Sequence, residues 1–116
     1  MKPKMMTDSG GRTGELFIFA RFHAKEGEEN AASSLLREEV RAAQGDLGCI
    51  THEAYRSTRD PSLFFIHSRW VDEAAFEEHL KMRHTIRFAE HIEPLLDHEL
   101  QVTRTRPLEA TAASPS

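Results

Sequence analysis

The sequence contains a single cysteine, Cys49, among its 116 residues, so no disulfide can form within one chain. It also lacks any apolar run approaching the ~18 residues that a membrane-spanning helix needs. The lysines near the start are not followed by the apolar stretch that is typical of a secretory signal. We therefore expect a cytoplasmic protein with no membrane partner.

Clusters of basic residues are missing as well. The 15 Lys and Arg residues are spread among 19 Asp and Glu residues, which gives a formal net charge of −4. Because nucleic-acid binding depends on neutralising phosphates, we expect no nucleic-acid partner. A chain of 116 residues has room for one core. Both ends are poor in apolar residues, so we expect flexible tails at 1–13 and 106–116 around one domain at 14–105.

Apolar patterns predict four strands and two helices. Aromatic and branched residues indicate strands at 15–24, 49–57, 62–71 and 95–104. Helical spacing predicts one helix from about Ala32 to Gly45 and a second that begins at Asp72 and continues until Pro94. The order is βαββαβ, which predicts an α+β, ferredoxin-like fold. In this fold a four-stranded antiparallel sheet carries two helices on one face.

Both faces of the expected sheet carry apolar side chains. In the first strand Ile18 and Phe22 alternate with Phe19, and in the third strand Trp70 alternates with Phe65. Two helices can cover only one of these faces. We expect a second copy of the chain to cover the other, sheet against sheet, as a homodimer. Coverage by the tails or by an unrelated partner is the alternative.

Several short motifs occur together along the expected domain. They are Gly48-Cys49 before the second strand, Asp60-Pro61 before the third, Trp70 with Asp72-Glu73-Ala74 after it, and then His79 and His84. In this combination the chain resembles the antibiotic biosynthesis monooxygenase (ABM) superfamily of small proteins. The resemblance implies a dimeric α+β barrel. Superfamily members include cofactor-independent oxygenases of quinols and polycyclic phenols, haem-degrading enzymes and an isomerase, so the resemblance is specific for the fold and not for the reaction.

The resemblance implies a cofactor-independent monooxygenase that oxidises a small aromatic quinol or phenol with molecular oxygen. In such enzymes the substrate supplies the electrons, so the protein needs a dry apolar pocket and a base near neutral pH. Two departures bear on this. Ser68 stands where many quinol monooxygenases carry a carboxylate, and the first strand has no Asn of the kind that haem-degrading members use.

His79 is the predicted base or hydrogen-bond partner of the substrate. It follows Phe76 by three residues, which places both on the sheet-facing side of the second helix. A core histidine whose nitrogens are satisfied by backbone groups is the alternative. His84 is predicted at the rim of the pocket, and a helix-end histidine favoured by the helix dipole is its alternative.

The other predicted substrate-binding residues are Trp70, Ser68, His52 and Phe76. Trp70 and Ser68 share a strand face, which suits a pocket wall and a polar contact within it, although core packing explains Trp70 nearly as well. His52 lies on the second strand and can reach the same cavity. If the helices cover the Trp70 side, His67 lies in the dimer interface.

The seven histidines also raise the question of a metal site. No pair has the i, i+4 spacing that places two imidazoles side by side on a helix, and His79 and His84 are five residues apart. We therefore expect no metal and no other cofactor. Two further functions stay open: a non-catalytic dimer that binds a small hydrophobic or aromatic metabolite, and a haem-binding or haem-degrading protein. The missing carboxylate at Ser68 favours the binding protein, and the histidines favour an enzyme.

Overall fold

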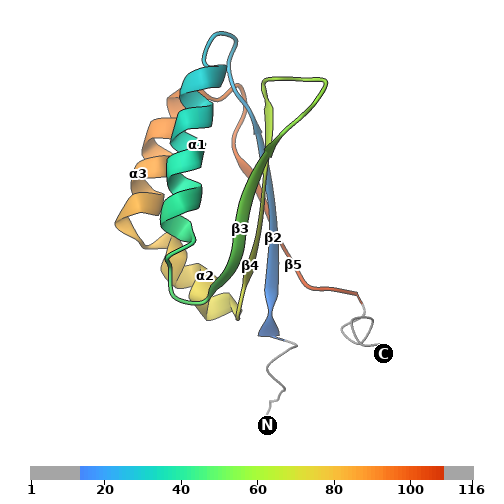
Figure 1. Cartoon of the computed structure of the whole chain (residues 1–116), viewed down its shortest axis with the longest axis vertical. Coiled ribbons are helices and arrows are strands. Elements are labelled where there is room, and N and C mark those ends of the chain that lie inside the picture. The colour runs from blue at the N-terminus through green and yellow to red at the C-terminus, as the bar shows by residue number, and fades with distance from the viewer. Residues whose placement is uncertain (1–13, 109–116) are drawn as a thin grey trace.

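The computed structural model describes residues 14–108 and contains one antiparallel sheet with helices on a single side (Figure 1). Its strands are β2 (Leu16–His23), β3 (Cys49–Arg56), β4 (Leu63–Trp70) and β5 (Gln101–Thr105), in the spatial order β3-β4-β2-β5. Helix α1 (Glu29–Ala43) connects β2 to β3. The predicted α+β, ferredoxin-like fold with a four-stranded antiparallel sheet is confirmed. Of the tails predicted at 1–13 and 106–116, only 106–108 lie within the described residues, and none of the described helices is long and apolar enough to cross a membrane.

Alternation of side chains divides the sheet into a covered and an open face. The residues that point toward the helices are buried and form the sheet's side of the core: Leu16, Ile18, Ala20, Phe22, Phe64, Ile66 and Trp70. On the opposite face Phe19 and Phe65 are 51% and 37% exposed. His67 lies on this open face, where its ring contacts Phe19 at a centroid distance of 4.8 Å. The helices therefore cover the Trp70 side.

The second predicted helix is two helices, so the prediction of one helix from Asp72 to Pro94 was wrong. Asp72 does cap the first of them, α2 (Glu73–Leu80), by accepting a hydrogen bond from the backbone N–H of Ala75. The chain then turns at Met82, whose backbone is extended, into α3 (Arg83–Ile92) and a 3₁₀ turn, η2 (Glu93–Leu95).

Burial explains the break at Met82. Helix α2 buries His79 and α3 buries Phe88. These residues are nine positions apart, and at about 100° per residue a continuous helix would place them on opposite sides. The break allows both side chains to face inward.

The last strand is shorter than the pattern in 95–104 indicated. Leu95 belongs to η2, and Leu96 forms an isolated bridge with Ala24 while its side chain packs in the core. The ladder with β2 begins only at Gln101. The prediction was therefore right for the second half of this segment. It failed for the first half because the two leucines pack on the core before the chain reaches the sheet edge.

Gly48 permits a close contact between the α1–β3 connection and α2. Its φ is +85°, and a Cβ at this position would lie 2.5 Å from the Cβ of Ala75 and 3.1 Å from Cγ2 of Val71. Its carbonyl also accepts a hydrogen bond from the N–H of Val71 at 2.9 Å. The absence of a side chain therefore sets how closely the connection approaches α2.

We predict that Gly48→Ala lowers the free energy of unfolding by about 2–4 kcal/mol, from left-handed backbone strain together with overpacking against Ala75. Gly27→Ala is the matched control, because Gly27 has a φ of +89° but no atom within 4 Å of the added Cβ. The control should lose only about 1 kcal/mol from backbone strain. Urea denaturation measures both, and equal losses would contradict the packing explanation.

Candidate functional site

A cavity of about 150 Å³ lies between the covered face of the sheet and helices α2 and α3. Apolar side chains make up most of its wall, among them Ile18, Ile66, Phe76, Leu80, Phe88 and Val102. The polar side chains that line it are Glu39, His52, Ser68, His79 and Thr85. It is thus an apolar chamber with a few polar groups, which is the usual character of a small-molecule site.

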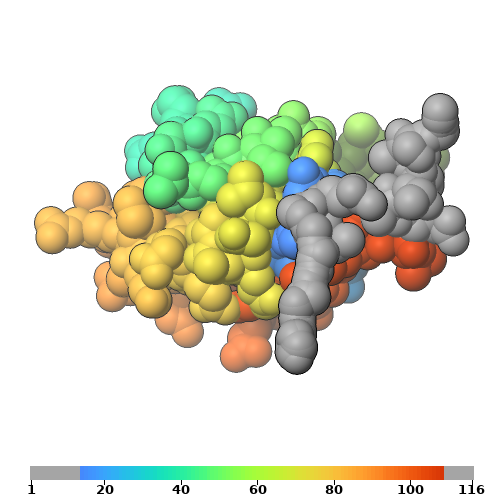
Figure 2. All heavy atoms as spheres, turned by 90° about the horizontal axis from the view of Figure 1, so that it is seen from below, coloured from blue at the N-terminus to red at the C-terminus, as the bar shows by residue number. Residues whose placement is uncertain are grey.

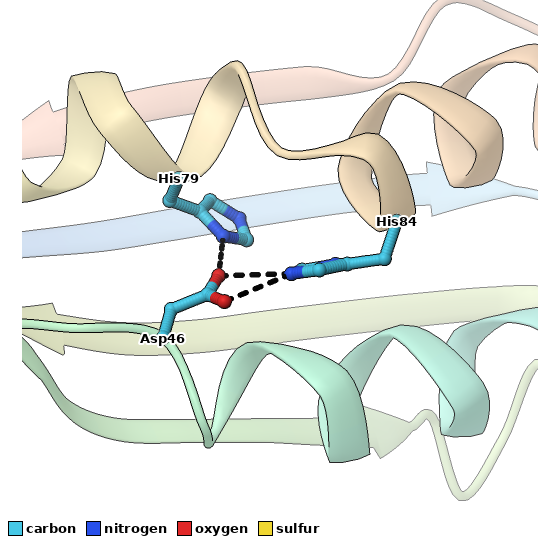
Figure 3. A group of neighbouring side chains, drawn as sticks. All are labelled: Asp46, His79 and His84. Carbon is cyan, nitrogen blue, oxygen red and sulfur yellow. Dashed lines mark hydrogen bonds and ion pairs between the residues drawn. The ribbon is translucent and has the colours of Figure 1, made fainter.

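Beside this cavity, three side chains from separate segments converge (Figure 3). His79 comes from α2, His84 from the first turn of α3, and Asp46 from the connection after α1. Nδ1 of His79 lies 2.7 Å from Oδ2 of Asp46, and Nε2 of His84 lies 3.0 Å from both carboxylate oxygens. The view of this end of the molecule shows α2 (yellow) adjoining the end of α1 (green) and α3 (orange) (Figure 2).

Glu39, from the buried side of α1, adds a second carboxylate to this cluster. Its Oε1 lies 2.8 Å from Nδ1 of His84, and its Oε2 accepts a hydrogen bond from the hydroxyl of Thr85 at 3.0 Å. The same Oε2 is 3.6 Å from Nε2 of His79. Each of the two histidines therefore lies between two carboxylates.

The hydrogen bonds of this cluster shift the pKa values of Asp46 and His84. Burial alone would raise the pKa of Asp46, but the hydrogen bonds to His79 and His84 lower it below its ordinary value. Burial alone would lower the pKa of His84, but the hydrogen bonds to Glu39 and Asp46 raise it. The cluster thus favours an ionised Asp46 and a cation at the position of His84.

His52 differs from these two histidines. Burial lowers its pKa to about 4, with the neighbouring His79 as the second cause. Its Nδ1 is buried and has no hydrogen-bond partner within residues 14–108. His52 is therefore a neutral imidazole at the cavity wall with an unused ring nitrogen.

Trp70 packs directly behind His79. The two ring centroids are 4.6 Å apart, and Trp70 is fully buried. Its indole N–H donates to the hydroxyl oxygen of Ser68 at 3.0 Å. The ring of Phe76 lies 5.8 Å from both His79 and Trp70. These contacts hold the plane of the His79 ring in place.

The residues predicted from the sequence divide into two groups. His52, Ser68, Phe76 and His79 line the cavity. Trp70 and His84 do not: Trp70 lies behind His79, and His84 lies on the outer side in a groove between α1 and α3. The sequence pattern also placed His79 and His84 on one continuous helix, where a spacing of five residues points their side chains in different directions. That premise was wrong, because the break at Met82 brings their rings to 5.7 Å.

Sequence reasoning missed Glu39, Asp46 and Thr85. A signal for Glu39 was present, since it follows Leu36 by three residues and precedes Ala43 by four, on the buried stripe of α1. A charged residue on such a stripe indicates a buried partner. Asp46 and Thr85 gave no comparable signal, because a turn residue and a helix-start residue have no periodic neighbours.

Comparisons with known proteins agree with this architecture. Residues 16–91 match the family model described as antibiotic biosynthesis monooxygenase. The chain is similar to the crystal structure of PA3566 from Pseudomonas aeruginosa, with a TM-score of 0.79, 27% identity, and coverage of 86% of this chain and 100% of that one. It has the fold of Rv0793 from Mycobacterium tuberculosis (TM-score 0.78, 22% identity, coverage 82% and 96%). It also has the fold of a Bacteroides thetaiotaomicron protein described as a possible oxidoreductase (TM-score 0.76, 17% identity, coverage of 81% of this chain and 98% of that one). No curated protein sequence matches the chain.

Glu39→Gln should lower the free energy of unfolding by about 2–3 kcal/mol. The carboxylate accepts hydrogen bonds through both oxygens, and in the amide one of these oxygens becomes an NH₂ donor that faces His84 or Thr85. The neighbouring Glu38 is exposed on the same helix. Glu38→Gln should therefore change stability by less than about 0.5 kcal/mol. Chemical denaturation of the two variants tests the contrast. Equal stabilities would mean that the carboxylate–histidine cluster contributes nothing to folding.

Proposed function

The chain belongs to the antibiotic biosynthesis monooxygenase family, and we propose that it oxidises a small aromatic quinol or phenol with molecular oxygen, without a cofactor. The observation that carries the proposal is the apolar cavity with His79 in its wall and Asp46 hydrogen-bonded to that histidine. Apolar walls exclude water, and an oriented imidazole can accept a proton.

The cavity volume favours a single-ring substrate. The cavity has about 150 Å³ of space, which is room for a molecule the size of benzene. A monocyclic hydroquinone fits that space better than a polycyclic phenol. Haem is much larger than one ring, so in this cavity it would have to extend outward past the exposed side chains of Leu80 and Val102.

His79 is proposed as the group that accepts the substrate's hydroxyl proton. Asp46 contacts Nδ1 at 2.7 Å and so keeps the ring proton on that nitrogen. Nε2 lies 3.6 Å from Oε2 of Glu39, beyond hydrogen-bonding distance, and keeps its lone pair. The resulting hydroquinone anion can pass electrons to oxygen. One oxygen atom then replaces a ring hydrogen and the other leaves as water, while the hydroquinone supplies all four electrons and ends as a hydroxyquinone.

His52 and Ser68 are proposed to orient the substrate. His52 lines the cavity as a neutral imidazole, and its ring can hydrogen-bond a second hydroxyl group of the substrate. Ser68 already accepts the indole N–H of Trp70, and its own hydroxyl hydrogen remains available. A substrate with two hydroxyl groups would therefore be fixed at both ends.

The homodimer is proposed to form through the open face of the sheet. Phe19, Tyr55 and Phe65 are exposed there, and members of the family are typically dimeric. Such a cluster of aromatic side chains favours burial against a matching surface. A second copy offers the same apolar face by symmetry.

Phe19→Glu should convert the dimer to a monomer, because it places a charge in the centre of that face. Ile86→Glu is the matched control, since Ile86 is similarly exposed, at 46%, but lies on α3. Analytical ultracentrifugation gives the mass of each. A dimeric Phe19→Glu variant, or a monomeric Ile86→Glu variant, would argue against the open face as the interface.

Oxygen uptake tests the chemistry. Protein freed of metal and flavin should consume oxygen with monocyclic hydroquinones above the spontaneous rate. His79→Gln should reduce the enzymatic rate by about 100-fold or more, the usual contribution of a general base. The exposed histidine variant His98→Gln is the control and should keep the wild-type rate.

The alternative is a non-catalytic dimer that binds a small aromatic metabolite in the same cavity. Ser68, in place of a strand carboxylate, supports this alternative. If a folded dimer binds hydroquinones by calorimetry and consumes no oxygen with any of them, the binding protein replaces the oxygenase. Uptake that survives in His79→Gln would instead leave an oxygenase with a different base.

A further inference from the structure

The donor atoms of Asp46, His79 and His84 have the composition and spacing of a metal site. One ligand atom from each of these residues lies within 4.8 Å of the other two. The carboxylate of Asp46 contacts Nδ1 of His79 at 2.7 Å and Nε2 of His84 at 3.0 Å. They come from three separate segments and converge on one point (Figure 3). Two imidazoles and one carboxylate are a common ligand set for divalent transition metals.

Both ring nitrogens of His84 face carboxylate oxygens, but a neutral imidazole has only one N–H group to donate. Its Nδ1 and Nε2 both contact carboxylates, at 2.8 and 3.0 Å, and a neutral imidazole carries a single proton. The carboxylates of Glu39 and Asp46 are only 4% and 7% exposed, and within residues 14–108 their ion pairs are all with histidines. The contact is satisfied if His84 is an imidazolium, if one carboxyl group is protonated, or if a metal ion lies between Nε2 and Asp46.

We infer that Asp46, His79 and His84 bind one divalent transition-metal ion, through a carboxylate oxygen, Nδ1 of His79 and Nε2 of His84. Ligand atoms around a tetrahedral Zn²⁺ ion are about 3.4 Å apart. The carboxylate–imidazole distances of 2.7 and 3.0 Å need to widen by about 0.7 and 0.4 Å to reach this spacing. The mixed nitrogen and oxygen donors suit Zn²⁺, Co²⁺ or Fe²⁺ better than Mg²⁺ or Ca²⁺, which prefer oxygen alone.

Glu39 supports this assignment from outside the ligand set. A metal-bound histidine usually donates its other ring N–H to a carboxylate, which fixes the tautomer and the ring orientation. Nδ1 of His84 has such a partner in Oε1 of Glu39. The hydroxyl of Thr85 in turn donates to the other oxygen of Glu39 and holds that carboxylate in place. With Nδ1 protonated, Nε2 of His84 has the lone pair that a metal requires.

The metal site goes beyond the proposed oxygenase. It requires the other tautomer of His79 from the one that the oxygenase requires. A metal on Nδ1 forces the ring proton onto Nε2. His79 would then be a hydrogen-bond donor in the cavity and would not accept a substrate proton. Metal occupation and proton acceptance by His79 are therefore alternative states of one cluster, and each is measured separately.

Calorimetric titration with ZnCl₂, with no substrate present, tests the site directly. The protein is produced without a histidine tag and is first dialysed against a chelator. We expect one Zn²⁺ per chain and no binding of Mg²⁺ or Ca²⁺. Asp46→Asn and His84→Gln should each weaken binding by at least about 100-fold, and Glu39→Gln by about 10–100-fold as an outer partner. His98→Gln, which removes an exposed histidine flanked by acidic residues, should bind like the wild type.

Imidazole ¹⁵N NMR of the wild-type protein provides a test that needs no variant to fold. Addition of one equivalent of Zn²⁺ should shift Nδ1 of His79 and Nε2 of His84 to metal-bound values and leave His98 unchanged. Binding that is lost in His98→Gln but not in His84→Gln, or Zn²⁺ that shifts neither cluster histidine, would overturn the inference. Because oxygen uptake is measured on metal-free protein, failure of the oxygenase proposal leaves this result unaffected.

Discussion

The buried carboxylate of Asp46 constrains much of this structure. A carboxylate removed from water is strongly unfavourable unless it is hydrogen-bonded or paired. Asp46 obtains its partners, His79 and His84, from two different helices. This requires the chain to break at Met82, and it requires the α1–β3 connection to approach α2 closely, which Gly48 permits. The backbone geometry at Met82 and Gly48 and the pairing of the side chains in the cluster therefore depend on each other.

The one-sided layering of the fold generates two surfaces from the same strands. Alternation sends Ile18 and Ile66 toward the helices, where they line the cavity, and sends Phe19 and Phe65 outward. A sheet covered on both faces by its own helices would have no such open apolar surface. The cavity and the proposed dimer interface therefore lie back to back across one sheet, separated by a single layer of backbone.

The acidic groups of this chain come from a different part of the fold than the resemblance implied. Ser68 occupies the strand position where many quinol monooxygenases carry a carboxylate, and it binds the indole of Trp70 instead. The carboxylates near the cavity are supplied by the helical layer, from Glu39 and from Asp46. Family membership therefore establishes the architecture, while the reaction depends on side chains that can be supplied from any layer of it.

Local patterns were sufficient for much of the fold. Alternation predicted the strands and both sheet faces, and it placed Ser68 and Trp70 together. Helical spacing directed His79 toward the sheet. The meeting of Asp46 with His79 and His84, which are 33 and 38 residues further along the chain, was not predictable in this way. A periodic pattern reports which side of its own element a residue faces, whereas a contact between elements depends on where the backbone turns. At Met82 that turn involves neither glycine nor proline, so it was determined by the contacts that α2 and α3 make with the rest of the fold.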